Sequence, residues 1–187
     1  MKEKLLNHFK EVPIVAAAKS EAELEQCLNS RSRVIFLLFG DLCTVASLVR
    51  RIKEAGKIAI VHLDLIDGLA PKDVSVDFIA TATEADGIIS TKSSLIRYAN
   101  QRGLLTIQRY FLLDSRVLDN LSRTGCPADF LEVLPGVMPK IIRHLTSTID
   151  KPLIAGGMIR DKEDVMAALS AGAVAVSSTN GDVWFID

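Results

Sequence analysis

Two segments decide the fold, Pro152-Leu153-Ile154-Ala155-Gly156-Gly157-Met158-Ile159-Arg160 and Ala171-Gly172-Ala173-Val174-Ala175-Val176-Ser177-Ser178-Thr179. Each contains a short apolar run that ends in small residues, and a predicted helix over 162–171 lies between the two runs. Small residues leave backbone N–H groups accessible, and (β/α)8 barrels hold phosphate groups at two such strand ends, one helix apart. The pair therefore predicts both a barrel and a phosphorylated ligand.

The same alternation of apolar run and helix extends through the whole chain. We expect strands over 13–18, 34–40, 58–65, 87–91, 105–111, 130–136, 152–157 and 173–178. The capping-box pattern from Ser20 to Glu23 opens one of the helices, and we expect helices over 21–29, 42–55, 93–101 and 162–171. Alternating strands and helices give a parallel sheet, and eight units favour closure into a barrel. The sequence thus predicts a compact α/β fold, a single-domain (β/α)8 barrel over 1–187. An open doubly wound sheet is the alternative, but no G-x-G-x-x-G follows the first run.

Composition restricts the class of protein. Apolar residues make up 49% of the chain, aromatic residues 5%, and the net charge is −1. This balance argues against a strongly basic nucleic-acid binder but leaves a local RNA-binding patch open. The densest basic cluster comprises Arg50, Arg51, Lys53 and Lys57, and we interpret it as a solvated helix face.

Two further signals concern metals and membranes. The three cysteines are far apart and lack C-x-x-C spacing, so we expect neither a disulfide framework nor a zinc site. The chain shows no signal-peptide pattern and no apolar run of membrane-spanning length. We therefore expect a cytoplasmic protein with no membrane partner.

Polar residues at the predicted strand ends are the candidates for chemistry, because these ends converge on one mouth of the barrel. Alternation along 58–65 places His62 and Asp64 on one face, where an inward carboxylate must be paired or contact a ligand. The fourth strand ends with Ser90 and Thr91, and Lys92 follows it. Lys92 could act as a nucleophile if desolvated, although a lysine at this position more often stays solvated.

The fifth and sixth strands add further polar groups. Gln108 and Arg109 are adjacent, so only one of them can enter the barrel. Arg109 suits an anionic ligand or a carboxylate partner. Glu132 on the neighbouring strand could pair with it, and the ion pair and the ligand contact remain equal alternatives.

The last two strand ends form the predicted phosphate site. Gly156 and Gly157 permit close backbone approach, and Arg160 completes a cationic rim. Hydroxyl donors come from Ser177, Ser178 and Thr179. The sequence contains no P-loop, G-x-S-x-G or H-E-x-x-H motif, so no recognised catalytic or metal site accompanies this phosphate site.

Six segments carry a family resemblance: VHLDLIDG (61–68), GIISTKS (87–93), IQRYFLLDS (107–115), FLEVLPGVMP (130–139), PLIAGGMIR (152–160) and AGAVAVSSTN (171–180). With these segments the chain resembles the glycerol uptake operon antiterminator family. The resemblance implies a barrel without catalysis or cofactor that responds to glycerol 3-phosphate and binds leader mRNA. Matching segments give the ligand-site candidates Asp64, Ser90, Gln108, Arg109, Glu132, Gly136, Gly156, Gly157 and Ser177.

The chain departs from the family pattern in two places. Lys19 stands at the end of the first strand, where the family leads us to expect an arginine, and residues 39–43 are less polar than expected. The main alternative function is a barrel enzyme, an isomerase, aldolase or decarboxylase, in which Asp64 and Lys92 act on a small phosphorylated substrate. A third interpretation is a sensor that has lost RNA binding and acts through a protein partner. The sequence leaves open whether the protein is a homo-oligomer.

Overall fold

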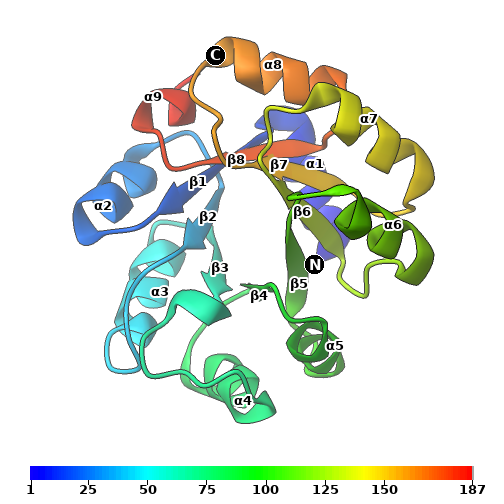
Figure 1. Ribbon diagram of the computed structural model, residues 1–187. Coiled ribbons are helices and arrows are strands. Elements are labelled where there is room, and N and C mark those ends of the chain that lie inside the picture. The colour runs from blue at the N-terminus through cyan, green and yellow to red at the C-terminus, as the bar shows by residue number, and fades with distance from the viewer. Residues whose placement is uncertain (187) are drawn as a thin grey trace.

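The computed structural model describes residues 1–186, except for the side chains of residues 122 and 124. Eight parallel strands form a closed barrel in the order β1 to β8, with helices around it (Figure 1). The strands are β1 (Ile14–Ala18), β2 (Val34–Leu37), β3 (Ile58–His62), β4 (Gly87–Ser90), β5 (Leu105–Phe111), β6 (Phe130–Leu134), β7 (Leu153–Gly156) and β8 (Ala175–Ser178). The helices are α1 (Lys2–Glu11), α2 (Glu21–Asn29), α3 (Val45–Glu54), α4 (Asp73–Ala82), α5 (Ser93–Gln101), α6 (Ser115–Thr124), α7 (Pro139–Thr148), α8 (Lys162–Ser170) and α9 (Gly181–Trp184). The predicted (β/α)8 fold is confirmed; only Asp187 of the domain predicted over 1–187 lies outside the described residues.

Most strands end earlier than the sequence led us to expect. The expected strand 58–65 stops at His62 and continues as a short 3-10 helix, η1 (Leu63–Leu65). Leu63 and Ile66 are buried even though they lie beyond the strand. Burial of apolar residues thus continues past the point where the backbone leaves the sheet, and hydrophobicity alone overextends the strand.

The interior of the barrel is packed with side chains that alternate along each strand. Inward positions include Phe36 and Ile60, in one buried cluster with residues from all the other strands. Helix α1 covers the N-terminal end of the barrel, because Leu5 and Phe9 belong to the same cluster. The Phe9 ring meets the Phe130 ring edge-on, with centroids 6.0 Å apart. The barrel is therefore closed at one end by apolar contacts, and the polar groups gather at the other.

Capping residues fix the starts of two helices whose positions the sequence predicted. The Ser20 hydroxyl accepts a hydrogen bond from the Glu23 N–H (3.2 Å), and the Glu23 carboxylate accepts one from the Lys19 N–H (2.7 Å). The Asp161 carboxylate accepts a hydrogen bond from the Asp164 N–H (2.9 Å) at the start of α8. None of the helices within residues 1–186 is both long and apolar enough to cross a membrane.

Candidate functional site

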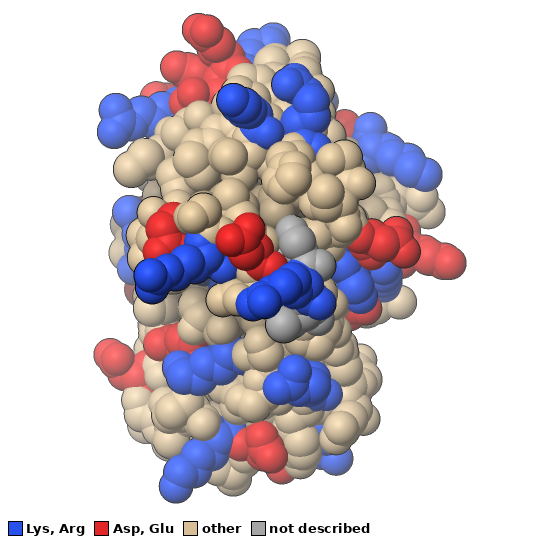
Figure 2. Space-filling view, turned by 45° about the vertical axis from the view of Figure 1, so that its right-hand side comes forward, with Lys and Arg blue, Asp and Glu red and all other residues tan. Residues whose placement is uncertain are grey.

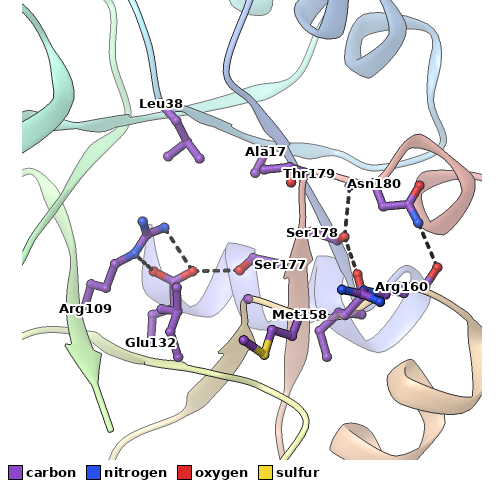
Figure 3. Close-up of a pocket in the computed structure, with 13 residues that line it drawn as sticks. Ala17, Leu38, Arg109, Glu132, Met158, Arg160, Ser177, Ser178, Thr179 and Asn180 are labelled. Atoms are coloured by element: carbon purple, nitrogen blue, oxygen red, sulfur yellow. Dashed lines mark hydrogen bonds and ion pairs between the residues drawn. The ribbon is translucent and has the colours of Figure 1, made fainter. Parts of the chain in front are cut away.

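A pocket of about 420 Å³ opens at the C-terminal ends of the strands. Its polar side comes from β5 to β8 and the loops after β7 and β8, whereas Ala17 and Leu38 form an apolar wall opposite (Figure 3). The full lining comprises Ala17, Leu38, Arg109, Glu132, Leu134, Gly157, Met158, Ile159, Arg160, Ser177, Ser178, Thr179 and Asn180. The volume suits a small metabolite.

The floor of this pocket holds a buried ion pair. The Arg109 Nε lies 2.6 Å from Glu132 Oε2, and its Nη2 lies 3.3 Å from Oε1. The two residues are register partners on β5 and β6, so the sheet sets their separation. The Ser177 hydroxyl donates to Glu132 Oε1 at 2.7 Å. The ion pair, one of the two alternatives that the sequence left open, is thus present, and contact of either residue with a ligand stays a prediction.

Gly156 makes this network sterically feasible. A Cβ at this position would lie 2.8 Å from Glu132 Oε1 and closer still to Ser177 Oγ. Because Gly156 is the register partner of Ser177, the hydroxyl passes over the glycine to reach the carboxylate on β6. Gly156 therefore shapes the pocket without itself appearing in its lining.

The rim of the pocket presents backbone donors. Gly157 and Met158 both have left-handed backbone conformations, with φ of 74° and 63°. Among the described residues, no acceptor bonds the N–H of Gly157, Met158 or Thr179, and all three residues line the pocket. Successive turn N–H groups of this kind form an anion-binding concavity. Left-handed geometry in a non-glycine residue is strained, and such strain clusters at ligand sites.

Arg160 and Ser178 occupy the outer part of the same rim. The exposed Arg160 side chain lines the pocket, while its N–H donates to Asp164 Oδ2 at 2.9 Å. The Ser178 hydroxyl is committed to the protein, because it donates to the Ile159 carbonyl at 2.8 Å and accepts from the Asn180 N–H at 3.0 Å. Ser178 thus ties the two rim loops together. Of the two cations in the pocket lining, Arg109 is paired with Glu132, and Arg160 makes no ion pair with any residue in 1–186.

His62 lies inside the barrel behind the ion pair. Only 3% of the residue is exposed, and its Nδ1 is the one buried side-chain nitrogen or oxygen in the described part of the chain without a hydrogen-bond partner. Burial, reinforced by the positive charge of Arg109, lowers the pKa of His62 to about 4. The imidazole is therefore neutral near pH 7.

Asp64, Ser90 and Lys92 form a second cluster that does not line the pocket. The Asp64 carboxylate accepts hydrogen bonds from the Ser90 hydroxyl (2.9 Å) and the Thr91 N–H (2.7 Å), and Lys92 Nζ lies 3.4 Å from it. Burial acts to raise the pKa of Asp64, but the hydrogen bonds from Thr91 and Ser90 outweigh it and leave the pKa below its usual value. Asp64 fixes the loop between β4 and α5.

Two further candidates also lie outside the pocket. Gln108 is buried on the outer side of β5, where its Nε2 donates to Ser93 Oγ at 2.5 Å, so Arg109 is the member of the pair that enters the barrel. Gly136 packs against β7, where a Cβ would lie 2.9 Å from the Gly156 N. Lys19, the departure in the first strand, is largely exposed and lies 3.9 Å from Glu23. Residues 39–43, the second departure, form a turn in which Asp41 Oδ1 accepts from the Cys43 N–H at 2.8 Å.

The structure adds pocket residues that sequence reasoning missed, namely Ala17, Leu38, Leu134, Met158, Ile159 and Asn180, and it places Thr179, which the sequence did suggest, in the lining. Met158 and Asn180 adjoin the recognised small-residue motifs, and that adjacency was the available signal. Ala17 and Leu38 carry no such signal, because inward apolar residues at a strand end look the same as core. Within residues 1–186, no three His, Cys, Asp or Glu side chains lie together in a way that could hold a metal ion.

Comparison with known proteins places this geometry in context. The family model described as "Glycerol-3-phosphate responsive antiterminator" matches residues 14–184. The Escherichia coli K12 protein called "Uncharacterized protein YgcP" is 42% identical over 182 residues, covering 96% of this chain and 95% of that protein.

Solved structures agree with this match. A glycerol uptake operon antiterminator regulatory protein from Listeria monocytogenes is 31% identical with a TM-score of 0.86, over 92% of this chain and 95% of that one. A glycerol uptake operon antiterminator-related protein from Thermotoga maritima is 27% identical with a TM-score of 0.77, over 91% and 96% of the two chains. A deoxyribose phosphate aldolase from Aeropyrum pernix, 16% identical with a TM-score of 0.68 over 97% and 96%, shares the fold alone. The chain therefore belongs to the family of glycerol-3-phosphate responsive antiterminators.

Proposed function

We propose that this protein is a cytoplasmic, non-catalytic regulator that binds glycerol 3-phosphate in the pocket and, in response, binds leader mRNA to prevent premature transcription termination. The observation that supports binding of glycerol 3-phosphate is the set of N–H groups at Gly157, Met158 and Thr179, which have no acceptor among the described residues and line the same pocket as the buried Glu132. Family membership supports the second half.

The pocket offers different chemistry to the two ends of such a ligand. The phosphate would accept hydrogen bonds from the rim N–H groups and pair with Arg160. The ligand's hydroxyls would face Glu132 and Ser177. Because Arg109 already balances the charge of Glu132, this floor favours neutral hydroxyl groups over a second anion.

A switch requires that the ligand favour one arrangement of the protein over another. The phosphate would bond the loop after β7 and the loop after β8 at once, and the two loops otherwise meet through the Ser178 hydroxyl and Asn180, whose Nδ2 donates to the Arg160 carbonyl at 2.8 Å. Ligand binding would therefore order both loops together. The differential affinity for the ordered loops supplies the coupling free energy to the RNA site.

The proposed binding of glycerol 3-phosphate is tested by a series of thermal denaturation experiments. Glycerol 3-phosphate at a hundredfold excess over its dissociation constant should stabilise the protein by about 2.7 kcal/mol. Glycerol and inorganic phosphate, each carrying half of the recognised groups, should stabilise it less at the same concentration. Ser177→Ala should weaken binding of glycerol 3-phosphate, whereas the matched control Thr91→Ala, on the loop that Asp64 holds, should not. If neither glycerol 3-phosphate nor a triose phosphate shifts the transition, the ligand assignment is wrong.

The enzyme alternative depends on Lys92 and Asp64, whose Nζ and Oδ1 atoms are 3.4 Å apart. Its specific support is that pair together with the aldolase-like fold. Against it, the Lys92 side chain is 46% exposed and lies outside the pocket lining. Lys92→Ala should therefore leave binding of glycerol 3-phosphate unchanged. Turnover of a triose phosphate by the wild-type protein that is lost in Lys92→Ala would favour the enzyme instead.

A further inference from the structure

Charge is distributed unevenly along this nearly neutral chain. Residues 92–151 contain nine Lys or Arg against five Asp or Glu, whereas the other 127 residues contain 13 against 18. The net charge of −1 therefore conceals a basic third and an acidic remainder. A polyanion would interact with each of these two parts separately, because salt screens electrostatic interactions beyond about 10 Å.

The basic third forms one side of the molecule. It includes the consecutive helices α5, α6 and α7, which lie next to each other around the barrel (Figure 1). Figure 2 turns this side toward the viewer and shows Lys and Arg side chains spread over it, with carboxylates between them. The three helices themselves hold one carboxylate, Asp119, against the exposed cations Arg97, Arg116, Arg123, Lys140 and Arg143.

Most of these cations lack ion-pair partners among the described residues, unlike two of the three cations of α3. On α3, Arg51 pairs with Glu21 at 2.6 Å and Lys53 with Asp86 at 2.6 Å. Four cations of α5 to α7 make no ion pair with any described residue, and we call them the four unpaired cations: Arg97, Arg116, Lys140 and Arg143. Two of the three cations of α3 are thus paired with carboxylates, whereas the four unpaired cations of α5 to α7 remain available.

A hollow of about 540 Å³ lies on α6 within this side. Arg116, Asp119, Asn120 and Arg123 line it, and Arg123 donates to Asn120 Oδ1 at 2.9 Å. Two guanidinium groups and one carboxylate, that of Asp119, therefore line the hollow. The guanidinium groups suit a phosphate group, which they bind with two hydrogen bonds.

The three helices lack what other partners need. The exposed large apolar side chains of the described part of residues 92–151, Phe111 and Leu113, lie before the start of α6 and not on the helices. A protein interface would need an apolar core, and the three helices themselves expose none. Single-stranded RNA would need aromatic platforms, but the one aromatic residue on these helices, Tyr98, is partly buried and donates to Asp77 Oδ2 at 3.0 Å. The remaining kind of partner that these helices suit is an RNA duplex, which they would bind through its phosphate groups.

We infer that the face formed by α5, α6 and α7 binds the phosphate backbone of double-stranded RNA, as in a hairpin of a leader transcript. The inference rests on the proposed function for the presence of RNA, and it adds the location and the form of that RNA. The face also has a direct connection to the effector pocket. Arg109 and Glu132 lie on β5 and β6, the two strands between these three helices, so a ligand on the ion pair contacts the elements that carry the face.

The test replaces the four unpaired cations together, as Arg97→Gln, Arg116→Gln, Lys140→Gln and Arg143→Gln. The matched control removes the same charge elsewhere, as Lys2→Gln, Lys4→Gln, Arg50→Gln and Lys72→Gln. Binding of a 16-base-pair RNA hairpin is measured at 50 and 200 mM salt with glycerol 3-phosphate present, beside single-stranded RNA of the same length. Because each phosphate contact contributes roughly 0.9 to the salt slope, the wild type and the control should lose about a hundredfold more affinity than the face variant over this range.

The outcomes separate this inference from the proposed function. Equal salt dependence in the face variant and the control would overturn the location of the RNA site. Tighter binding of the single strand than of the hairpin would overturn the double-stranded form. If the wild type binds neither hairpin nor leader transcript, the RNA half of the proposed function fails and the inference with it. Thermal denaturation and glycerol 3-phosphate binding should be the same in all three proteins, since none of the eight positions lines the pocket.

Discussion

The two halves of the barrel mouth are built from similar strands but have different chemistry. On the β5 to β8 side, Arg109, Glu132 and Ser177 form a buried polar network beneath unbonded backbone donors. On the β1 to β2 side, Ala17 and Leu38 present an apolar wall to the same pocket. The polar half can fix the orientation of a ligand, and the apolar half can only limit its size. The difference shows that a closed barrel can place recognition in one half while the other half supplies packing.

The largest expected effect comes from breaking the ion pair on the polar side. Glu132→Leu should lower the free energy of unfolding by about 3–5 kcal/mol, because it leaves the Arg109 guanidinium buried without a counter-charge. Urea denaturation measures this loss. The double substitution Arg109→Met with Glu132→Leu should recover most of it. Glu21→Leu, which removes an exposed partner of Arg51, should cost less than about 1 kcal/mol. Equal costs for Glu132→Leu and Glu21→Leu would contradict the distinction between buried and exposed pairs.

The next largest effect concerns His62, the buried polar residue that β3 contributes to the inside of the barrel. The pKa of His62 is lowered to about 4 in the folded protein, so between pH 6.5 and 4 the unfolded chain binds the proton and the folded protein does not. The free energy of unfolding should therefore fall by up to about 3 kcal/mol as the pH drops through this window. Denaturation of wild type and His62→Gln as a function of pH measures this loss. The difference in free energy of unfolding between the two proteins should shrink by that amount as the pH falls toward 4. An identical pH dependence in both proteins would show that His62 is accessible to protons, and His144→Gln serves as the exposed control.

A smaller effect is expected at the glycine that separates the polar network from β7. Gly156→Ala should cost about 1–3 kcal/mol, because its Cβ would push Glu132 and Ser177 apart. It should also weaken binding of glycerol 3-phosphate in calorimetry. Gly103→Ala is the control, since nothing lies within 4 Å of its Cβ and only its positive φ opposes the change. Unaltered ligand binding in Gly156→Ala would mean that the network does not contact the ligand.

The smallest effect concerns the strained rim. Met158→Gly should raise the free energy of unfolding by about 0.5 kcal/mol, because relief of the left-handed conformation slightly exceeds the added chain entropy. Met166→Gly on α8 is the matched control and should lower it by about 1 kcal/mol. Denaturation of both variants decides whether the rim stores strain, and a loss at Met158 as large as that at Met166 would argue against it.

Much of this architecture could be predicted from periodicity and capping. The strand positions and the helix start at Ser20 follow from residues that act locally. The end of β3 could not be predicted in this way, since Leu63 remains buried after the backbone leaves the sheet. Within the site, the pairing of Arg109 with Glu132 was foreseeable from neighbouring strands. The separation of Asp64 and Gln108 from the pocket was not, because it depends on where a strand ends and on which face of β5 is turned inward.

The apolar closure of the barrel by α1 determines how the pocket exchanges its contents. Because Leu5 and Phe9 fill the opposite opening, anything that reaches Glu132 enters and leaves by the mouth alone. A bound effector would then block this entrance itself and keep bulk solvent from the Glu132 carboxylate. Its residence time would be set by opening of the loops after β7 and β8, so the duration of the signal would depend on a few residues at one exit.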